Sequence, residues 1–128
     1  MEVFSYKTYL TQILKYPLLT GEQEIELSKK IQAGDQQAKT QIVNANLRLV
    51  VSIAKKYENK TVSLMDLIQE GNIGLMTAAG KYHFSFNTRF STYAYPWIAQ
   101  FIARYLQSKV SLISLPVRKE ELLHKIKK

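Results

Sequence analysis

Cysteine is absent from this 128-residue chain, and histidine, proline and glycine are scarce, with two, three and five residues respectively. Without cysteine the chain can form neither disulfide bridges nor thiolate metal sites. His83 and His124 have no further metal-ligating side chain at a usable spacing, so we expect no metal and no other cofactor. No apolar run is long enough to span a membrane, and the first ten residues lack the order of a signal peptide. These absences favour a cytoplasmic protein that has no membrane partner.

Sequence motifs for catalysis are also absent. Neither of the two common glycine-rich loops that hold phosphates occurs, and no serine lies in a nucleophile-elbow motif. The acidic residues are scattered along the chain, so they do not suggest a pair of catalytic carboxylates. We therefore expect a binding protein and not an enzyme.

The net charge of +8 is concentrated in the last third of the chain. Residues 83–128 carry eight Lys or Arg and two Asp or Glu, whereas residues 1–40 carry five of each kind. A basic surface attracts polyanions, most often nucleic acid or anionic membrane, although the same charge also promotes solubility. The charge distribution alone therefore favours nucleic acid as the partner.

The residue pattern predicts an all-α fold, a compact bundle of about five to six helices. Glycine and proline are few, and no segment alternates strictly enough for a half-buried strand. The segment 110–118 is expected to be extended or loop-like, because it leads to a proline. The expected helices cover residues 6–15, the segment between caps at 20 and 34, residues 36–57, a segment from the cap at 63, residues 91–108 and residues from 119 on.

Several helix ends have capping residues. Thr20 followed by Gln23 forms a capping box, and Asp35 and Ser63 are good N-caps for the helices that follow them. Gly34 suits the C-terminal end of a helix, where a left-handed residue is common. These residues predict where three helices begin and where one ends.

Gly71 and Gly74 lie inside one predicted helix. Glycine at such a position costs roughly 1 kcal/mol relative to alanine, so two of them indicate a close contact. The pattern alone leaves open whether the contact is made by another helix of the same domain or by a partner.

Aromatic residues are crowded into one part of the chain. A helix that also carries Gln100, Arg104 and Gln107 cannot bury rings on every side, so some rings should be exposed, while Phe90 and Phe101 are expected in the core. Exposed rings beside cations suit unpaired nucleic acid, since a stacked base contributes roughly 1–3 kcal/mol and extruding a base costs a few kcal/mol. Nine of the fourteen aromatic residues lie within 24 residues: Tyr82, Phe84, Phe86, Phe90, Tyr93, Tyr95, Trp97, Phe101 and Tyr105.

Longer segments resemble a known family. Region two of the bacterial sigma-70 family of initiation factors is closely similar to NANLRLVVSIAKKY (44–57), DLIQEGNIGLMTAAGKY (66–82) and RFSTYAYPWIAQFIARYL (89–106). Residues 9–39 resemble region 1.2 of the family, and residues 112–121 resemble the start of region three. The resemblance implies a helical domain of regions 1.2 and 2 over residues 1–112, followed by a truncated start of region three over residues 113–128.

The resemblance implies a sigma factor for transcription initiation that binds core RNA polymerase. Residues 66–76 are similar to the segment by which sigma factors grip the clamp coiled coil of the polymerase β′ subunit. A partner at this segment would also account for a close approach to Gly71 and Gly74. The implied polymerase contacts are Asp66, Gln69, Glu70, Asn72 and Met76.

The resemblance also implies that the chain recognises and melts the minus-ten promoter element. Tyr93 matches the tyrosine on which a flipped adenine of the non-template strand stacks, with Phe90 and Tyr82 at positions that build the pocket. Asn46 and Leu49 match a second pocket, for a thymine. Trp97 and Gln100 match contacts at the upstream edge of the element. The basic positions suited to phosphates are Arg89, Arg104 and Lys109. Glu121 falls near the family's contact to the extended minus-ten element.

Departures from the family pattern indicate an alternative, non-housekeeping type. Pro96 stands where the family has the first of two tryptophans, and Ser85 and Phe86 replace a basic pair. A proline within the helix should delay its start or kink it. Two other interpretations remain: a protein-interaction module bound by an anti-sigma factor, and a general basic RNA-binding helical domain.

Overall fold

The computed structural model describes residues 5–113, and within them the all-α fold class is confirmed. These residues form no strand, and none of their helices is long and apolar enough to cross a membrane. The predicted helix from residue 119 and the site residue Glu121 lie outside the described residues. The elements are α1 (Tyr6–Ile13), α2 (Gly21–Gln32), α3 (Gln36–Ala45), α4 (Leu47–Lys56), α5 (Leu64–Lys81), the short 3₁₀ helix η1 (Phe84–Phe86) and α6 (Phe90–Ile113).

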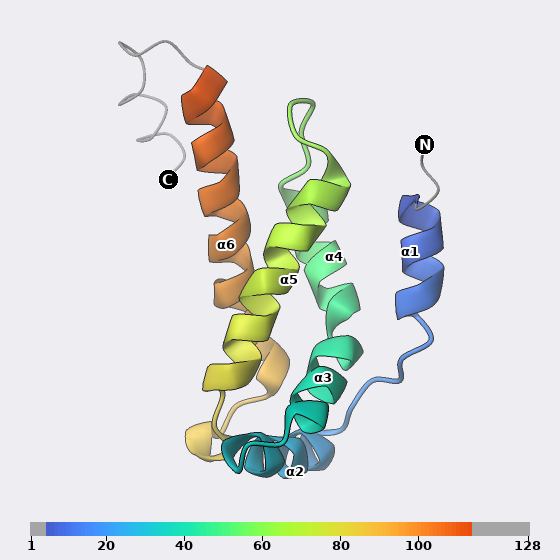
Figure 1. Ribbon diagram of the computed structural model, residues 1–128, viewed down its shortest axis with the longest axis vertical. Helices are drawn as coiled ribbons and strands as arrows, with labels where there is room; N and C mark the ends of the chain where they lie inside the picture. The colour runs from blue at the N-terminus through green and yellow to red at the C-terminus, as the bar shows by residue number, and fades with distance from the viewer. Residues whose placement is uncertain (1–4, 114–128) are drawn as a thin grey trace.

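The two longest helices, α5 and α6, pack side by side and share the largest interface of the fold. Figure 1 shows α4 beside α5, α1 at the outer side of α4, and α2 lying across the end of the bundle next to α3. Burial of large apolar side chains between these helices stabilises the bundle by roughly 1.5–3 kcal/mol for each side chain. The largest fully buried apolar side chains are Phe90, Ile42, Ile53, Leu67, Ile68, Leu75, Ile98, Ile102 and Val50.

The predicted caps are confirmed. The Gln23 N–H donates to the Thr20 hydroxyl over 3.1 Å, and the Thr20 N–H donates to Oε1 of Gln23 over 2.8 Å, which completes the capping box of α2. Asp35 accepts hydrogen bonds from the first turn of α3, and Ser63 caps α5. Gly34 follows the end of α2 with a φ of 97°, a conformation that glycine adopts readily.

The single helix predicted over residues 36–57 is wrong, because the chain forms α3 and α4 with a break at Asn46. Asn46 has φ −116° and ψ 11°, and its side-chain amide donates to the Ile42 carbonyl over 2.8 Å. A short polar side chain that binds nearby backbone competes with the helical hydrogen-bond ladder. The break turns α4 relative to α3 without interrupting the apolar stripe that misled the prediction.

The helix predicted over residues 91–108, α6, is longer than predicted at both ends. It begins at Phe90 and continues through Ile113, so the extended segment expected from residue 110 is wrong over residues 110–113. Neither glycine nor a second proline interrupts this stretch, so nothing in it stops the helix. Pro96 lies inside α6 and cannot donate to the Thr92 carbonyl, but both residues are exposed and water can bind that carbonyl.

At the other end of the chain, α1 ends at Ile13, two residues earlier than predicted.

Gly71 and Gly74 are buried against neighbouring helices of the same domain. A Cβ atom on Gly74 would lie 2.8 Å from the carbonyl oxygen of Trp97, and a Cβ atom on Gly71 would lie 2.7 Å from Cγ1 of Val50. The expectation that polymerase approaches these glycines is therefore wrong. They permit α5 to approach α6 and α4 closely, which fixes the two long helices relative to each other.

Candidate nucleic-acid and protein interfaces

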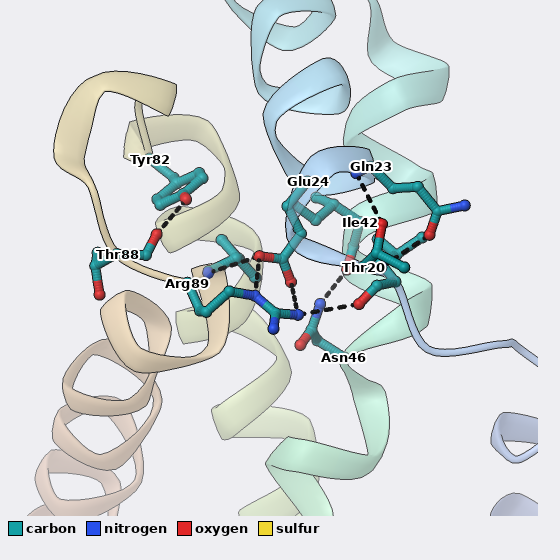
Figure 2. Close-up of polar contacts among 10 residues, drawn as sticks. Thr20, Gln23, Glu24, Ile42, Asn46, Tyr82, Thr88 and Arg89 are labelled. Carbon is teal, nitrogen blue, oxygen red and sulfur yellow. Dashed lines mark hydrogen bonds and ion pairs between the residues drawn. The ribbon is translucent and has the colours of Figure 1, made fainter.

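Tyr82 anchors a group of aromatic rings where α5 ends and α6 begins. Its ring lies edge-on to Phe90, with 5.2 Å between ring centroids, and its hydroxyl donates to the Thr88 carbonyl (Figure 2). Burial raises the pKa of the Tyr82 hydroxyl, the nearby Glu24 carboxylate raises it further, and Arg89 opposes them. The hydroxyl therefore stays protonated near neutral pH and remains a donor that ties the end of α5 to the segment before α6.

Tyr93 is half-buried and lies among three other rings. Its ring centroid is 5.5 Å from that of Tyr82, 5.4 Å from that of Phe86 and 6.4 Å from that of Trp97. Phe90 is fully buried behind Tyr82, as expected for a core residue. We call Tyr82, Phe86, Phe90, Tyr93 and Trp97 the aromatic cluster. It brings together three of the predicted DNA contacts from α6 and one from the end of α5.

The predicted contacts of α6 share one helix face. Tyr93, Trp97, Gln100 and Arg104 recur at spacings of four and three residues, which places them one above another along the helix. Gln100 and Arg104 are exposed, and Trp97 is half-buried with Lys81 Nζ 6.0 Å from its ring centroid. We call these four residues the α6 strip.

Two other α6 residues depart from expectation. Phe101 is only half-buried and has the Arg104 guanidinium 4.9 Å above its ring, so the prediction that it is a core residue is wrong. Lys109 lies over the ring of Tyr105 at 5.3 Å. It follows Tyr93 by sixteen residues, which turns it well away from the α6 strip at 3.6 residues per turn.

A hollow of about 420 Å³ lies on the other side of the start of α6. Asn46 and Leu49 line it together with Arg89 and Ser91, so the structure brings both predicted thymine-pocket residues to one concave surface. Ser91 and Tyr93 are two residues apart on a helix and therefore point to nearly opposite sides. The hollow and the aromatic cluster are thus separate sites on the two flanks of α6.

Glu24 joins α2 to the start of α6. Glu24 is 3% exposed, and its carboxylate accepts hydrogen bonds from Nε of Arg89 at 2.9 Å, from Nη2 of Arg89 at 3.2 Å and from the Phe90 N–H at 3.0 Å (Figure 2). A buried carboxylate at this position accepts a hydrogen bond from the first amide of α6, and the positive end of the α6 dipole stabilises its negative charge.

Arg89 is therefore committed in part to the fold. Its side chain is 55% exposed, but two of its nitrogens bind Glu24, and Nη2 also donates to the Leu19 carbonyl at 3.0 Å. The hydrogen bond and the charge of Glu24 raise the pKa of Arg89. A phosphate contact by Arg89 stays a prediction, and it would have to use the exposed part of a guanidinium that Glu24 already orients.

The predicted polymerase contacts lie on the outer face of α5, with one exception. Asp66, Gln69 and Met76 are exposed and Glu70 is half-buried. Asn72 is half-buried, and its amide donates to the Tyr9 hydroxyl of α1 over 3.2 Å. Four of the five residues therefore share a surface, whereas Asn72 links α5 to α1.

Comparison with known proteins identifies the family. Residues 42–111 match the family described as Sigma-70 region 2, and residues 5–37 match Sigma-70 factor, region 1.2. The chain belongs to the sigma-70 family. The outer face of α5 and the whole α6 strip fall within the part that matches region 2.

Relatives of this sigma-70 chain are themselves longer. It is 47% identical over 120 residues to RNA polymerase sigma factor SigA of Listeria monocytogenes, an alignment that covers 94% of this chain and 32% of the relative. RNA polymerase sigma factor SigA4 of Synechococcus elongatus is 42% identical over 141 residues, covering 94% of this chain and 45% of the relative. The chain thus spans between about a third and a half of the length of these relatives.

Sequence reasoning did not find three residues that join distant helices, Glu24, Lys56 and Tyr95. Glu24 looked like one more acid in the first turn of α2, because its partners lie 65 and 66 residues away. Lys56 and Tyr95 form a pair between α4 and α6, in which Lys56 Nζ donates to the Tyr95 hydroxyl over 2.8 Å. That hydrogen bond raises the pKa of Lys56. The only sequence signal for this pair was a lysine and an unassigned tyrosine on separate helices.

Proposed function

We propose that this chain is the part of a sigma factor that binds core RNA polymerase and captures flipped bases of the non-template strand of the minus-ten promoter element. The observation that carries the proposal is the half-exposed Tyr93 ring within the aromatic cluster, in a chain that belongs to the sigma-70 family. A factor with these partners would act in the bacterial cytoplasm.

Binding energy can drive strand opening without hydrolysis. A base stacked on an aromatic ring contributes roughly 1–3 kcal/mol, and removing it from the duplex costs a few kcal/mol. Tyr93 and Trp97 offer two ring surfaces, and Lys81 and Arg104 lie close enough to attract the phosphates between the bases. One or two stacks with nearby cations would therefore offset the extrusion of one base.

The hollow beside α4 has chemistry suited to a second base. The amide nitrogen of Asn46 is used by the Ile42 carbonyl, which leaves the amide oxygen to accept a hydrogen bond from outside (Figure 2). Thymine offers an N–H donor at its base-pairing edge, and Leu49 supplies an apolar surface for its ring. We propose that this hollow takes the thymine while Tyr93 takes the adenine, on the two flanks of α6.

The outer face of α5 is the proposed polymerase surface, with the clamp coiled coil of the β′ subunit as the partner. Ile73 and Met76 are each 44% exposed, and Asp66 and Glu70 add negative charge beside them. Exposed apolar side chains at the centre of a charged helix face are typical of protein interfaces. An anti-sigma factor would occupy this same face and compete with polymerase.

Pro96, and the replacement of the family's basic pair by Ser85 and Phe86 in η1, support the alternative type of sigma factor. Pro96 leaves a single tryptophan at the upstream edge of the α6 strip. We therefore propose a promoter preference that differs upstream of the flipped adenine while the stacking site is retained.

The test separates the two surfaces. With core polymerase added, Tyr93→Ala should abolish most promoter opening, measured by thymine reactivity to permanganate, and should leave polymerase binding unchanged. Met76→Ala and Gln69→Ala should weaken polymerase binding, measured by fluorescence anisotropy of the labelled chain, and Lys60→Ala, on an exposed loop, serves as the control. Normal opening by Tyr93→Ala would refute the proposal.

A further inference from the structure

Phe86 is an exposed aromatic side chain that the proposed function does not yet use. It is 47% exposed, although its ring lies 5.4 Å from Tyr93 and 6.0 Å from Tyr82, measured between centroids. An exposed ring packed beside another partly exposed ring forms an aromatic surface that water covers poorly. The aromatic cluster therefore presents two adjacent rings to solvent, Tyr93 and Phe86.

The position of Phe86 is fixed by its own short segment. Phe86 ends η1, where the Ser85 N–H donates to His83 Nδ1 over 3.1 Å and the Phe86 N–H donates to the His83 carbonyl over 3.0 Å. Asn87 follows with a φ of 61°, in the left-handed region. This local hydrogen-bonded turn fixes the backbone of Phe86 beside Tyr93, so only the Phe86 side chain has to move to admit a ligand.

We propose that Phe86 is a second stacking surface for the base that Tyr93 captures, so that the base is held between two rings. The inference rests on the proposed function and adds a second base-stacking residue to it. A base between two rings needs about 3.5–4.0 Å on each face, so the two rings must lie about 7–8 Å apart, whereas their centroids are now 5.4 Å apart and their planes are tilted by 44°. Phe86 must therefore swing outward, which its exposure at the end of a three-residue helix permits.

The second ring makes a specific contribution to recognition. Among the described residues, no cation lies over the ring of Tyr93 or Phe86, whereas Lys81 lies over Trp97 and Lys29 over Phe84. Stacking of a base between the rings of Tyr93 and Phe86 therefore depends on the area of ring contact and not on charge. Phe86 should strengthen capture of either purine over a missing base, and it should not distinguish adenine from guanine.

The test uses the chain with core polymerase and a single-stranded non-template oligonucleotide. The oligonucleotide carries adenine, guanine or an abasic site at the flipped position, and affinity is measured by fluorescence anisotropy. Phe86→Ala should reduce the preference for a purine over the abasic site by roughly 5- to 150-fold, the equivalent of one stack. Phe84→Ala is the matched control, because Phe84 lies in the same η1 helix but stacks on His83 at 4.3 Å.

The outcomes distinguish this inference from the function on which it rests. Loss of purine preference in Phe86→Ala but not in Phe84→Ala supports the second surface, and Phe86→Trp should then restore the preference. An unchanged preference in Phe86→Ala, with loss in Tyr93→Ala, overturns the inference and leaves the proposed function standing. Tighter purine binding by Phe86→Ala would show that Phe86 covers Tyr93 and would also overturn it. An unchanged preference in Tyr93→Ala would instead refute the proposed function.

Discussion

Replacing Gly74 by alanine should destabilise the domain, because the added methyl group meets the backbone of α6. Its Cβ would lie 2.8 Å from the Trp97 carbonyl oxygen and 3.1 Å from the Ile98 Cα, so the whole helix must shift. Overpacking of this kind costs typically 1–3 kcal/mol, whereas alanine gains about 1 kcal/mol in helix propensity. The backbone contact places the cost in the upper part of its range, which leaves a net loss of about 1–2 kcal/mol.

Gly80→Ala is the matched control in the same helix. A Cβ atom there would lie 3.5 Å from Lys39 Nζ, the end of a flexible side chain, so only the propensity gain of about 0.5–1 kcal/mol remains. Urea unfolding followed by far-ultraviolet circular dichroism should place Gly74→Ala about 1.5–3 kcal/mol below Gly80→Ala, the sum of the two effects. Equal stability of the two variants would refute the close helix approach.

Three further predictions concern the contacts that hold the sites in place. Glu24→Ala leaves the buried Phe90 amide without its acceptor, whereas Glu24→Gln retains an acceptor oxygen. The free energy of unfolding should therefore be about 1–3 kcal/mol lower for Glu24→Ala than for Glu24→Gln. Equal unfolding free energies would contradict the helix-capping role. The pKa of Tyr82 is raised in the folded state, so its contribution is complete below the unfolded value near 10 and is lost as pH rises through the folded pKa. Unfolding from pH 8 to 11 should therefore show a penalty for Tyr82→Phe that shrinks at high pH, and a constant penalty would exclude this linkage. Asn72→Ala should accelerate hydrogen exchange in α1 while Gln69→Ala does not, and unchanged exchange in α1 would remove the linking role of Asn72.

Features that depend on neighbouring residues in the chain were predictable. The capping box at Thr20 and Gln23 and the caps at Asp35 and Ser63 need only a hydroxyl, an amide or a carboxylate within three residues of the amide that it satisfies. The crowding of rings along α6 was equally visible, because the spacing of side chains on one helix follows from its pitch.

Features that depend on distant residues were not predictable from the pattern alone. Glu24 could be separated from an ordinary surface acid only by knowing that Arg89 and Phe90 lie against it. The two buried glycines of α5 indicated a close contact but could not say which helix makes it. The break at Asn46 was hidden because one hydrogen bond to Ile42 decides it while the apolar stripe runs on.

Placement of the sites also required the structure. Matching residues to the family implied an adenine pocket and a thymine pocket, but only the fold shows that the residues of the two lie on opposite flanks of α6. Asn72 was grouped with the polymerase contacts by its place in the segment, but its hydrogen bond directs it toward α1. A helix carries several faces, and a linear motif does not state which face a residue belongs to.

The most direct test of the account is a double-mutant cycle between Tyr93 and the base at the flipped position. The affinity of the polymerase-bound chain for a non-template oligonucleotide is measured with adenine and with an abasic site, for the unmodified chain and for Tyr93→Ala. The account predicts that adenine is preferred by roughly 5- to 150-fold by the unmodified chain, the value of one stack, and that Tyr93→Ala removes most of this preference. An equal preference for adenine in both proteins would contradict the claim that Tyr93 captures the base.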